Sequence, residues 1–237
     1  MSDKTPTVTV YQFPAIDGVQ IGPFCLKLTT WLQIAGIPFT ASSGMRSDKA
    51  PKGKMPYAKI NEDYLADSQI IINHLKSYSD PDDWLSAEQK ALAVAVQRMV
   101  EDHLYFILIC MRWVDKTAFT SMKELYFAKM PSLLRKFIPN LIRRSVVRTM
   151  RGHGMSRHSD QELLAMADAD FKALSVLLGD KIFFMGDKPC SLDAIVYGQL
   201  VTICRFNWQS PFKDLCESYP NLMAFVERMQ QRYGLCG

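Results

Sequence analysis

The chain has 237 residues, of which 48% are hydrophobic and 22% charged, a composition that excludes a disordered protein and allows one large globular domain or two ordinary ones. Its formal net charge of +4 is small, so any basic surface must come from local clustering of charges. The longest apolar run, residues 104–111, is far shorter than the roughly 20 residues that a membrane-spanning helix needs.

The first 80 residues predict a strand, a helix, a second strand, a hairpin of two strands and a final helix. Alternation of β-branched and aromatic residues indicates the strands, and apolar residues at helical spacing indicate the helices. These elements occupy residues 7–13, 23–36, 37–41, 56–66 and 67–78, and a polar loop spans 42–54. This order is that of a thioredoxin-like unit, which we assign to residues 1–80.

After a linker near 79–85 only helices are expected. Ser86 with Gln89, and Ser159 with Glu162, have the spacing of capping boxes, which start helices. The expected helices cover residues 86–113, 159–178, 191–206 and 221–233, and residues 114–158 are left unassigned. The fold class is therefore an α/β domain followed by an all-α domain over residues 86–237.

Two motifs in the first domain suit a peptide-like ligand. Pro56 begins a strand directly after a Lys/Gly-rich loop, so Met55–Pro56 is a candidate for a cis bond that would turn the Met55 backbone toward an extended peptide. An ordinary trans proline is the alternative. Ser68 and the first amides of its helix can donate to a carboxylate, and Asp67 can pair with an ammonium group. The alternative is a simple helix cap.

The stretch GPFCLK, residues 22–27, fits the start of a helix, with Gly22 at the N-cap and Pro23 at the first helical position. Cys25 lies one turn in. A thiol near a helix N-terminus can have a lowered pKa and be reactive, whereas a cysteine beside an apolar stripe can instead be a small buried hydrophobe. Both interpretations stay open from the sequence.

Several segments, in order, resemble glutathione transferases. In the first half they are TVYQFP, PFCLK, GKMPYAKI and LADSQIIINHL, and in the second half EDHLYFILICMRW, GDKPCSLDAIVYGQL and YPNLMAFVERM. The resemblance is closest to the branch of failed-axon-connections, metaxin-like and cadmium-resistance proteins. It implies a thioredoxin-like domain with a glutathione site, followed by an all-helical domain.

The resemblance also implies roles for the motif residues. Met55–Pro56 would be the cis-proline pair that hydrogen-bonds the cysteinyl part of glutathione, and Asp67–Ser68 would hold its γ-glutamyl end. Lys54 would reach the glycine carboxylate, unless it is only solvated. An acid at Glu101 or Asp102 would meet the glutathione ammonium, unless both acids form surface salt bridges.

The sequence departs from the family pattern at two positions. The family activates the glutathione thiol with a tyrosine at the end of the first strand or with a Ser or Cys at the start of the first helix, and that second position is Gly22. Tyr11 remains as a hydroxyl donor, or else is an ordinary half-buried strand residue. In the buried capping box, Cys190 replaces the usual hydroxyl residue while Asp193 is kept, which we expect to affect folding.

Residues 129–158 hold the one concentration of charge. The segment has eight basic and no acidic residues: Lys129, Arg135, Lys136, Arg143, Arg144, Arg148, Arg151 and Arg157. Interleaved apolar residues favour an anionic membrane surface or a solvated helix face, and phosphate binding is another option. A nucleic-acid partner is not expected, since no recognised binding module accompanies the charges.

The resulting expectation is a cytoplasmic, homodimeric glutathione S-transferase, with glutathione as co-substrate, no metal and a small electrophile as second substrate. The cytoplasmic location follows from six cysteines without C-x-x-C spacing and from the lack of a secretory leader. Two alternatives are a non-catalytic, metaxin-like adaptor on a membrane surface or protein partner, and glutathione-dependent thiol–disulfide exchange through Cys25.

Overall fold

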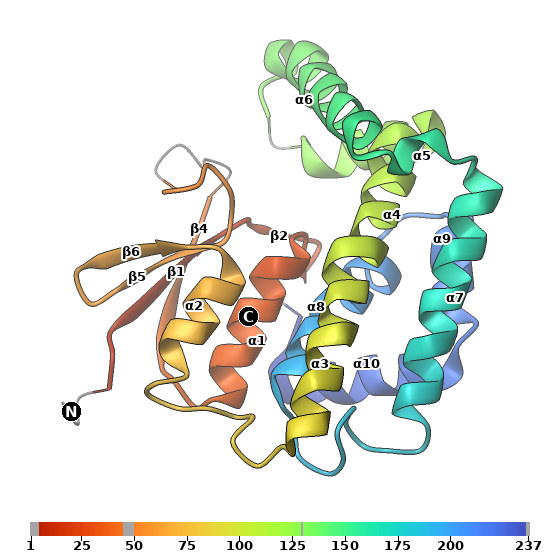
Figure 1. Ribbon diagram of the computed structural model, residues 1–237. Helices are drawn as coiled ribbons and strands as arrows, with labels where there is room; N and C mark the ends of the chain where they lie inside the picture. Colours follow the sequence, from red (N-terminus) through yellow and green to blue (C-terminus); the bar gives the residue numbers. More distant parts are fainter. Residues whose placement is uncertain (1–4, 45–49, 129, 236–237) are drawn as a thin grey trace.

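The computed structural model describes residues 5–44, 50–128 and 130–235, and Figure 1 shows a small α/β domain beside a larger helical one. This arrangement confirms the predicted fold class. The elements of the first domain are β1 (Val8–Gln12), β2 (Ala15–Ile16), β3 (Val19–Gln20), α1 (Pro23–Ile34), β4 (Phe39–Ser43), β5 (Tyr57–Ile60), β6 (Asp63–Ala66) and α2 (Ser68–Leu75).

The main sheet is mixed and has the strand order β4-β1-β5-β6. β1 runs parallel to β4 and antiparallel to β5, and β5 and β6 form the predicted hairpin. Along β1 the buried residues alternate with partly exposed ones, so that Val8 and Val10 enter the core formed with α1 and α2, whereas Tyr11 lies on the other face. The short β2–β3 hairpin, which the sequence analysis did not predict, turns at Asp17 and Gly18, both with positive φ.

The second domain is helical. Its elements are α3 (Ala87–Arg98), η1 (Met99–Leu104), α4 (Tyr105–Ile109), η2 (Cys110–Val114), α5 (Lys116–Tyr126), α6 (Ser132–His153), η3 (Met155–Arg157), α7 (Asp160–Leu178), α8 (Ser191–Cys204), α9 (Pro211–Glu217) and α10 (Pro220–Tyr233). The first four follow one another without a break and correspond to the single helix predicted over 86–113. Two π-helical stretches, η1 and η2, interrupt this rod.

The two domains meet where α1 packs against α8. A side chain at Gly198 of α8 would place its Cβ 2.6 Å from the carbonyl oxygen of Pro23 and 2.9 Å from the amide nitrogen of Lys27, so glycine is needed for this approach. Trp31 Nε1 donates to Ser191 Oγ at 2.8 Å, which adds a polar contact across the same seam. The helix that begins at Pro23 is thereby held from behind by the second domain.

The start of α8 is fixed by a buried carboxylate. Asp193 accepts hydrogen bonds from the backbone N–H groups of Phe184 (2.9 Å) and Cys190 (2.8 Å) and contacts the Cys190 thiol at 3.2 Å. Cys190 thus occupies the N-cap position of α8, where the resemblance to glutathione transferases implies a hydroxyl residue. Burial raises the pKa of Asp193 to about 6.

α6 carries most of the basic segment and projects away from the rest of the molecule at the top of Figure 1. Lys129, the first residue of that segment, lies outside the described residues. None of the helices in the described ranges is long and apolar enough to cross a membrane.

Candidate functional site

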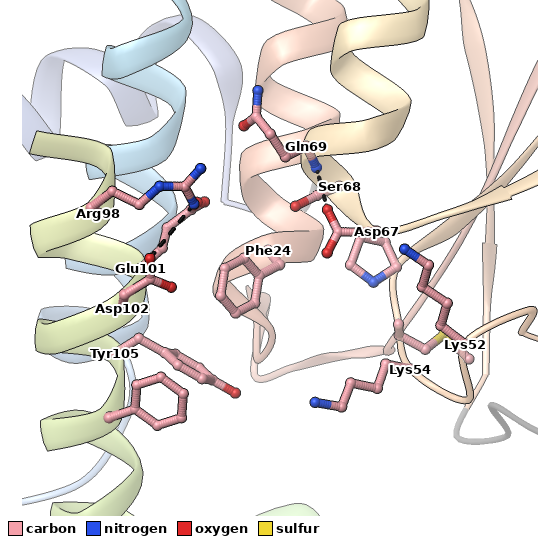
Figure 2. A pocket seen from close by; sticks show the side chains of 13 residues that line it. Phe24, Lys52, Lys54, Asp67, Ser68, Gln69, Arg98, Glu101, Asp102 and Tyr105 are labelled. Atoms are coloured by element: carbon pink, nitrogen blue, oxygen red, sulfur yellow. Dashed lines mark hydrogen bonds and ion pairs between the residues drawn. The ribbon is translucent and has the colours of Figure 1, made fainter. Parts of the chain in front are cut away.

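A cavity of about 300 Å³ lies between the two domains. In Figure 2 the second domain contributes Arg98, Glu101, Asp102 and Tyr105 to one wall, and the first domain contributes the opposite wall. That opposite wall consists of Phe24, Lys52, Lys54, Met55, Pro56, Asp67, Ser68 and Gln69. The structure therefore brings together seven residues that the sequence singled out: Lys54, Met55, Pro56, Asp67, Ser68, Glu101 and Asp102.

The two predicted binding motifs face this first cavity. The Met55–Pro56 peptide bond is cis, which is one of the two alternatives that the sequence left open. Asp67 has a φ of 83°, an uncommon conformation for a residue other than glycine, and its carboxylate accepts from the Gln69 N–H at 2.9 Å. Ser68, which begins α2, is buried. Uncommon backbone geometry at the rim of a cavity is typical of ligand sites.

Beside Ser68, a buried polar network joins the two domains. Lys27 Nζ donates to Glu101 Oε1 at 2.6 Å and to Gln69 Oε1 at 2.9 Å. Gln97 Nε2 in turn donates to both Gln69 and Glu101, at 2.7 Å each. Burial lowers the pKa of Lys27, while the charge of Glu101 opposes this shift. Glu101 is therefore a partner of Lys27, and the sequence analysis did not predict this pair.

Asp102 forms a surface salt bridge, which was the alternative to a role in binding the glutathione ammonium. Its carboxylate pairs with Arg98 one helical turn earlier, at 3.6 Å, and both side chains are more than half exposed. Such a pair stabilises a helix only slightly.

A second, larger cavity of about 420 Å³ adjoins the first. It shares Phe24, Met55 and Tyr105 with the first cavity. Its other lining residues are mostly apolar: Phe13, Ile21, Gly22, Pro23, Cys25, Leu108, Ile109, Arg112, Trp113, Tyr126, Phe127 and Ile142. A cavity lined by several charged residues thus adjoins one that is mostly apolar.

Gly22 and Cys25 line the second cavity at the start of α1. Gly22 has ordinary extended backbone, but a Cβ there would lie 3.0 Å from Cys25 Sγ and 3.2 Å from the Phe13 ring. Cys25 is buried, and burial raises its pKa to about 12, so its thiol is protonated at neutral pH. This environment is that of a packed hydrophobe rather than of an activated thiolate.

Tyr11 lines neither cavity. It stacks on Tyr57, with ring centroids 4.5 Å apart, on the sheet face opposite α1. A hydrogen bond with Tyr64 and burial raise its pKa. The structure therefore does not place Tyr11 in the wall of either cavity, beside the predicted glutathione-binding residues or Cys25.

Tyr105 is a phenol that sequence reasoning missed. It lies at the junction of the two cavities, and Figure 2 shows it pointing from α4 across the first cavity. Burial raises its pKa to about 12, so it keeps its proton. Lys27, Arg112 and Tyr105 have no local motif. Tyr105 and Arg112 are seven residues apart, so only their place on one face of a helix could have hinted at a common site.

Within the described ranges, no group of His, Cys, Asp and Glu side chains is arranged to hold a metal ion.

The fold and the paired cavities define a glutathione transferase type of architecture. A family model of the glutathione S-transferase N-terminal domain matches residues 23–118, and one of the C-terminal domain matches residues 167–229. An isoprene-epoxide–glutathione S-transferase from Rhodococcus sp. (strain AD45) is 31% identical over 238 residues, which cover 96% of this chain and 100% of that protein. The chain belongs to the glutathione S-transferase superfamily.

Other relatives carry names that state no enzymatic activity. Failed axon connections from Drosophila melanogaster is 29% identical over 240 residues, 95% of this chain but 57% of that protein, so the chain spans little more than half of it. Human metaxin-2 is 24% identical over 212 residues, 88% of this chain and 81% of that protein. These relatives confirm the branch that the sequence motifs indicated.

Solved structures agree on the fold. The beta-etherase LigF from Sphingobium sp. strain SYK-6 superposes with a TM-score of 0.63 at 14% identity, covering 97% of each chain. Rice GST1, solved in complex with glutathione, gives a TM-score of 0.60 at 14% identity and covers 96% of this chain and 88% of its own.

Proposed function

We propose that this chain is a glutathione S-transferase that binds glutathione in the first cavity and adds its thiolate to a small electrophile in the second. The observation that carries this proposal is the junction of the two cavities at Phe24, Met55 and Tyr105. Two reactants bound on either side of that junction have their reacting atoms close together, which lowers the entropic cost of reaction.

Each end of glutathione has a suitable partner in the first cavity. Asp67 and the Ser68 hydroxyl suit the ammonium and carboxylate of the γ-glutamyl group, and the Met55 backbone suits the cysteinyl peptide groups. Lys52 and Lys54 lie on the same wall of the cavity, which the first domain forms, and suit the glycine carboxylate. This assignment places the glutathione sulfur toward the start of α1.

Activation of that sulfur falls to donors other than a hydroxyl at position 22. In the first turn of α1, Pro23 has no N–H, and the N–H groups of Cys25 and Leu26 bond to the Gly22 carbonyl. The Phe24 N–H and the positive end of the helix remain to stabilise a thiolate. The Tyr105 hydroxyl, on the opposite side, can donate to the thiolate or to the electrophile.

Calorimetric titration with glutathione, followed by an assay with a chloro-dinitro aromatic, tests the proposal. The wild type should bind glutathione and release chloride, and Ser68→Ala should weaken glutathione binding about tenfold, because one hydrogen bond to a charged group is lost. A wild type that neither binds glutathione nor conjugates the aromatic rules the proposal out.

α6 supports a second function, docking on an anionic membrane surface. On its outer half Leu133, Phe137 and Leu141 are 59–68% exposed, and they lie one above another at helical spacing. Arg144, Arg148 and Arg151 continue the same stripe, are exposed, and form no ion pair within the described part of the chain. Exposed apolar residues followed by cations are typical of helices that lie in a membrane interface.

Vesicle flotation tests this docking function. We expect the protein to float with phosphatidylserine-containing vesicles at low salt and less at moderate salt, but not with phosphatidylcholine vesicles alone. Changing Phe137→Ser and Leu141→Ser should abolish flotation, whereas Val176→Ser, at an exposed apolar residue on α7, should not. A wild type that never floats with anionic vesicles contradicts it.

Homodimer formation and a cytoplasmic location remain predictions from the resemblance and the cysteine pattern. Gel filtration with light scattering would measure the first.

A further inference from the structure

Arg112, in η2, is a buried cation in the wall of the second cavity. It is 3% exposed, and its Nη1 donates to the Tyr126 hydroxyl at 3.3 Å. Its Nε and Nη2 atoms are also buried, and neither has a hydrogen-bond partner. These two nitrogens lie along one edge of the guanidinium, and their N–H groups form the fork that matches the two oxygens of a carboxylate.

The surrounding protein compensates for the charge only in part. Phe206 and Trp208 lie 5.3 and 5.2 Å from the guanidinium carbon, so their rings stabilise it without supplying acceptors for the N–H groups. Within the described ranges, Arg112 forms no salt bridge with an acidic side chain. Buried charged donors without acceptors are costly, and a ligand that supplies acceptors would remove that cost.

We propose that the electrophile taken by the second cavity carries a carboxylate, which the Nε–H and Nη2–H groups of Arg112 bind side by side. This proposal rests on the proposed transferase function and names its substrate class. The Tyr126 phenol accepts from Nη1, away from this edge of the guanidinium, and so leaves the Nε–H and Nη2–H groups to the carboxylate. The apolar remainder of the wall suits an aromatic or aliphatic body.

The carboxylate positions the substrate and takes no part in the bond changes. With an aryl chloride, the glutathione sulfur forms a bond to the ring carbon, the carbon–chlorine bond breaks, and chloride leaves with its electron pair. The thiol proton goes to solvent. With an epoxide, a carbon–oxygen bond breaks instead, and the resulting alkoxide takes up a proton.

A pair of substrates that differ only in charge tests the inference. Conjugation of 4-chloro-3-nitrobenzoate and of its carboxamide is measured with the wild type and with Arg112→Met, Arg112→Lys and Lys172→Met. Lys172 is exposed on α7 and lines neither cavity, so its variant controls for the loss of one positive charge. The ratio of the two kcat/KM values, compared between variants, cancels the different intrinsic reactivities of the substrates.

We expect Arg112→Met to lower the acid-to-amide ratio by about ten- to a hundredfold, as for loss of charged hydrogen bonds. Arg112→Lys should recover part of the ratio, because it keeps the charge but not the fork. Lys172→Met should leave the ratio unchanged. An unchanged ratio in a folded Arg112→Met variant, as judged by thermal unfolding, overturns the inference and leaves the transferase function standing.

Binding of unreactive 4-nitrobenzoate separates the two proposals. Trp113 lines the second cavity, so its fluorescence should report the ligand. If the wild type conjugates neither substrate nor the chloro-dinitro aromatic and does not bind glutathione, the transferase function fails, and the inference about Arg112 is then decided by binding. It stands if wild type binds nitrobenzoate more tightly than nitrobenzamide and Arg112→Met does not, and it falls if the two ligands bind alike.

Discussion

Gly22 has little room for a side chain, because Cys25 and Phe13 pack closely against it. A serine there would bring its Cβ to 3.0 Å from Cys25 Sγ, so the single change Gly22→Ser overfills the start of α1. We expect it to lower the free energy of unfolding by about 1–3 kcal/mol, as overpacking does. Urea denaturation would measure this loss.

Removal of the Cys25 sulfur should restore the stability of the Gly22→Ser variant and allow the serine hydroxyl to act on the thiolate. In Gly22→Ser with Cys25→Ala, the serine has room and can donate to the thiolate, so we expect conjugation about tenfold faster than in Cys25→Ala alone. The ultraviolet absorbance of bound thiolate should rise in parallel. Equal rates in the two variants would show that position 22 does not face the glutathione sulfur.

Asp193 makes stability depend on pH. Its pKa of about 6 in the folded protein is above the usual value of 3.8, so the folded state binds the extra proton and this contribution to stability is lost as pH rises through 6. Relative to Asp193→Asn, the wild type should therefore be about 2 kcal/mol more stable at about pH 4.5 than at pH 7.

Urea unfolding of both proteins at the two pH values measures this difference. All other ionisable groups are common to both proteins, so their effects cancel in the comparison. A constant difference would mean that Asp193 is ionised throughout the range.

Among the elements, the contact between α1 and α8 depends on a glycine, Gly198. Gly198→Ala would place a methyl group within 3 Å of backbone atoms of Pro23 and Lys27, so the helices must move apart. We expect a loss of about 1–3 kcal/mol in the free energy of unfolding, together with weaker glutathione binding, because the start of α1 shifts.

Gly152 of α6 is the matched control. An added Cβ there meets nothing within 4 Å, so Gly152→Ala should stabilise the helix by about 0.5–1 kcal/mol and leave glutathione binding unchanged. Equal effects of the two substitutions in calorimetry would contradict a steric role for Gly198.

Several of the elements that the sequence predicted have apolar residues that face the core. β1 and α1 show clear periodicity because Val8, Val10, Leu28 and Leu32 are buried. α6 was not predicted, since its outward face holds leucines and its interior holds Pro139, so its pattern is not that of a helix with one buried face. The π-helical stretches have no periodic signal either.

At the scale of the whole molecule, the Lys27–Glu101 pair ties one domain to the other at the site. Its side chains are only 2% and 10% exposed, so removal of one partner leaves a buried charge. We expect Lys27→Met to cost about 3–5 kcal/mol in the free energy of unfolding. The double change Lys27→Met with Glu101→Gln should cost less than the sum of the single changes, by about 0.5–3 kcal/mol.

Urea denaturation of the four proteins gives this coupling, and the exposed pair Lys59–Glu62 offers a reference cycle in which we expect little or no coupling. Additive effects at Lys27 and Glu101 would mean that the contact between the domains does not depend on their charge.

The site was predictable where it is local in sequence. Met55–Pro56 and Asp67–Ser68 each combine a backbone feature with a side chain over two residues, so a short motif indicates them. Arg112 and Tyr105 enter the site only because a helix of the second domain lies against α1. Such neighbours depend on tertiary packing, which a single sequence does not reveal.

The glycine contact between α1 and α8 links the positions of the two cavity walls. α1 carries Phe24, one of the three residues at the cavity junction, yet α8, which lies behind it, sets its position. A chimera that took residues 1–80 from another transferase would therefore have to import the matching face of α8 as well. Under the proposed function, changes that adapt the helical domain to a new electrophile would also shift the glutathione thiol.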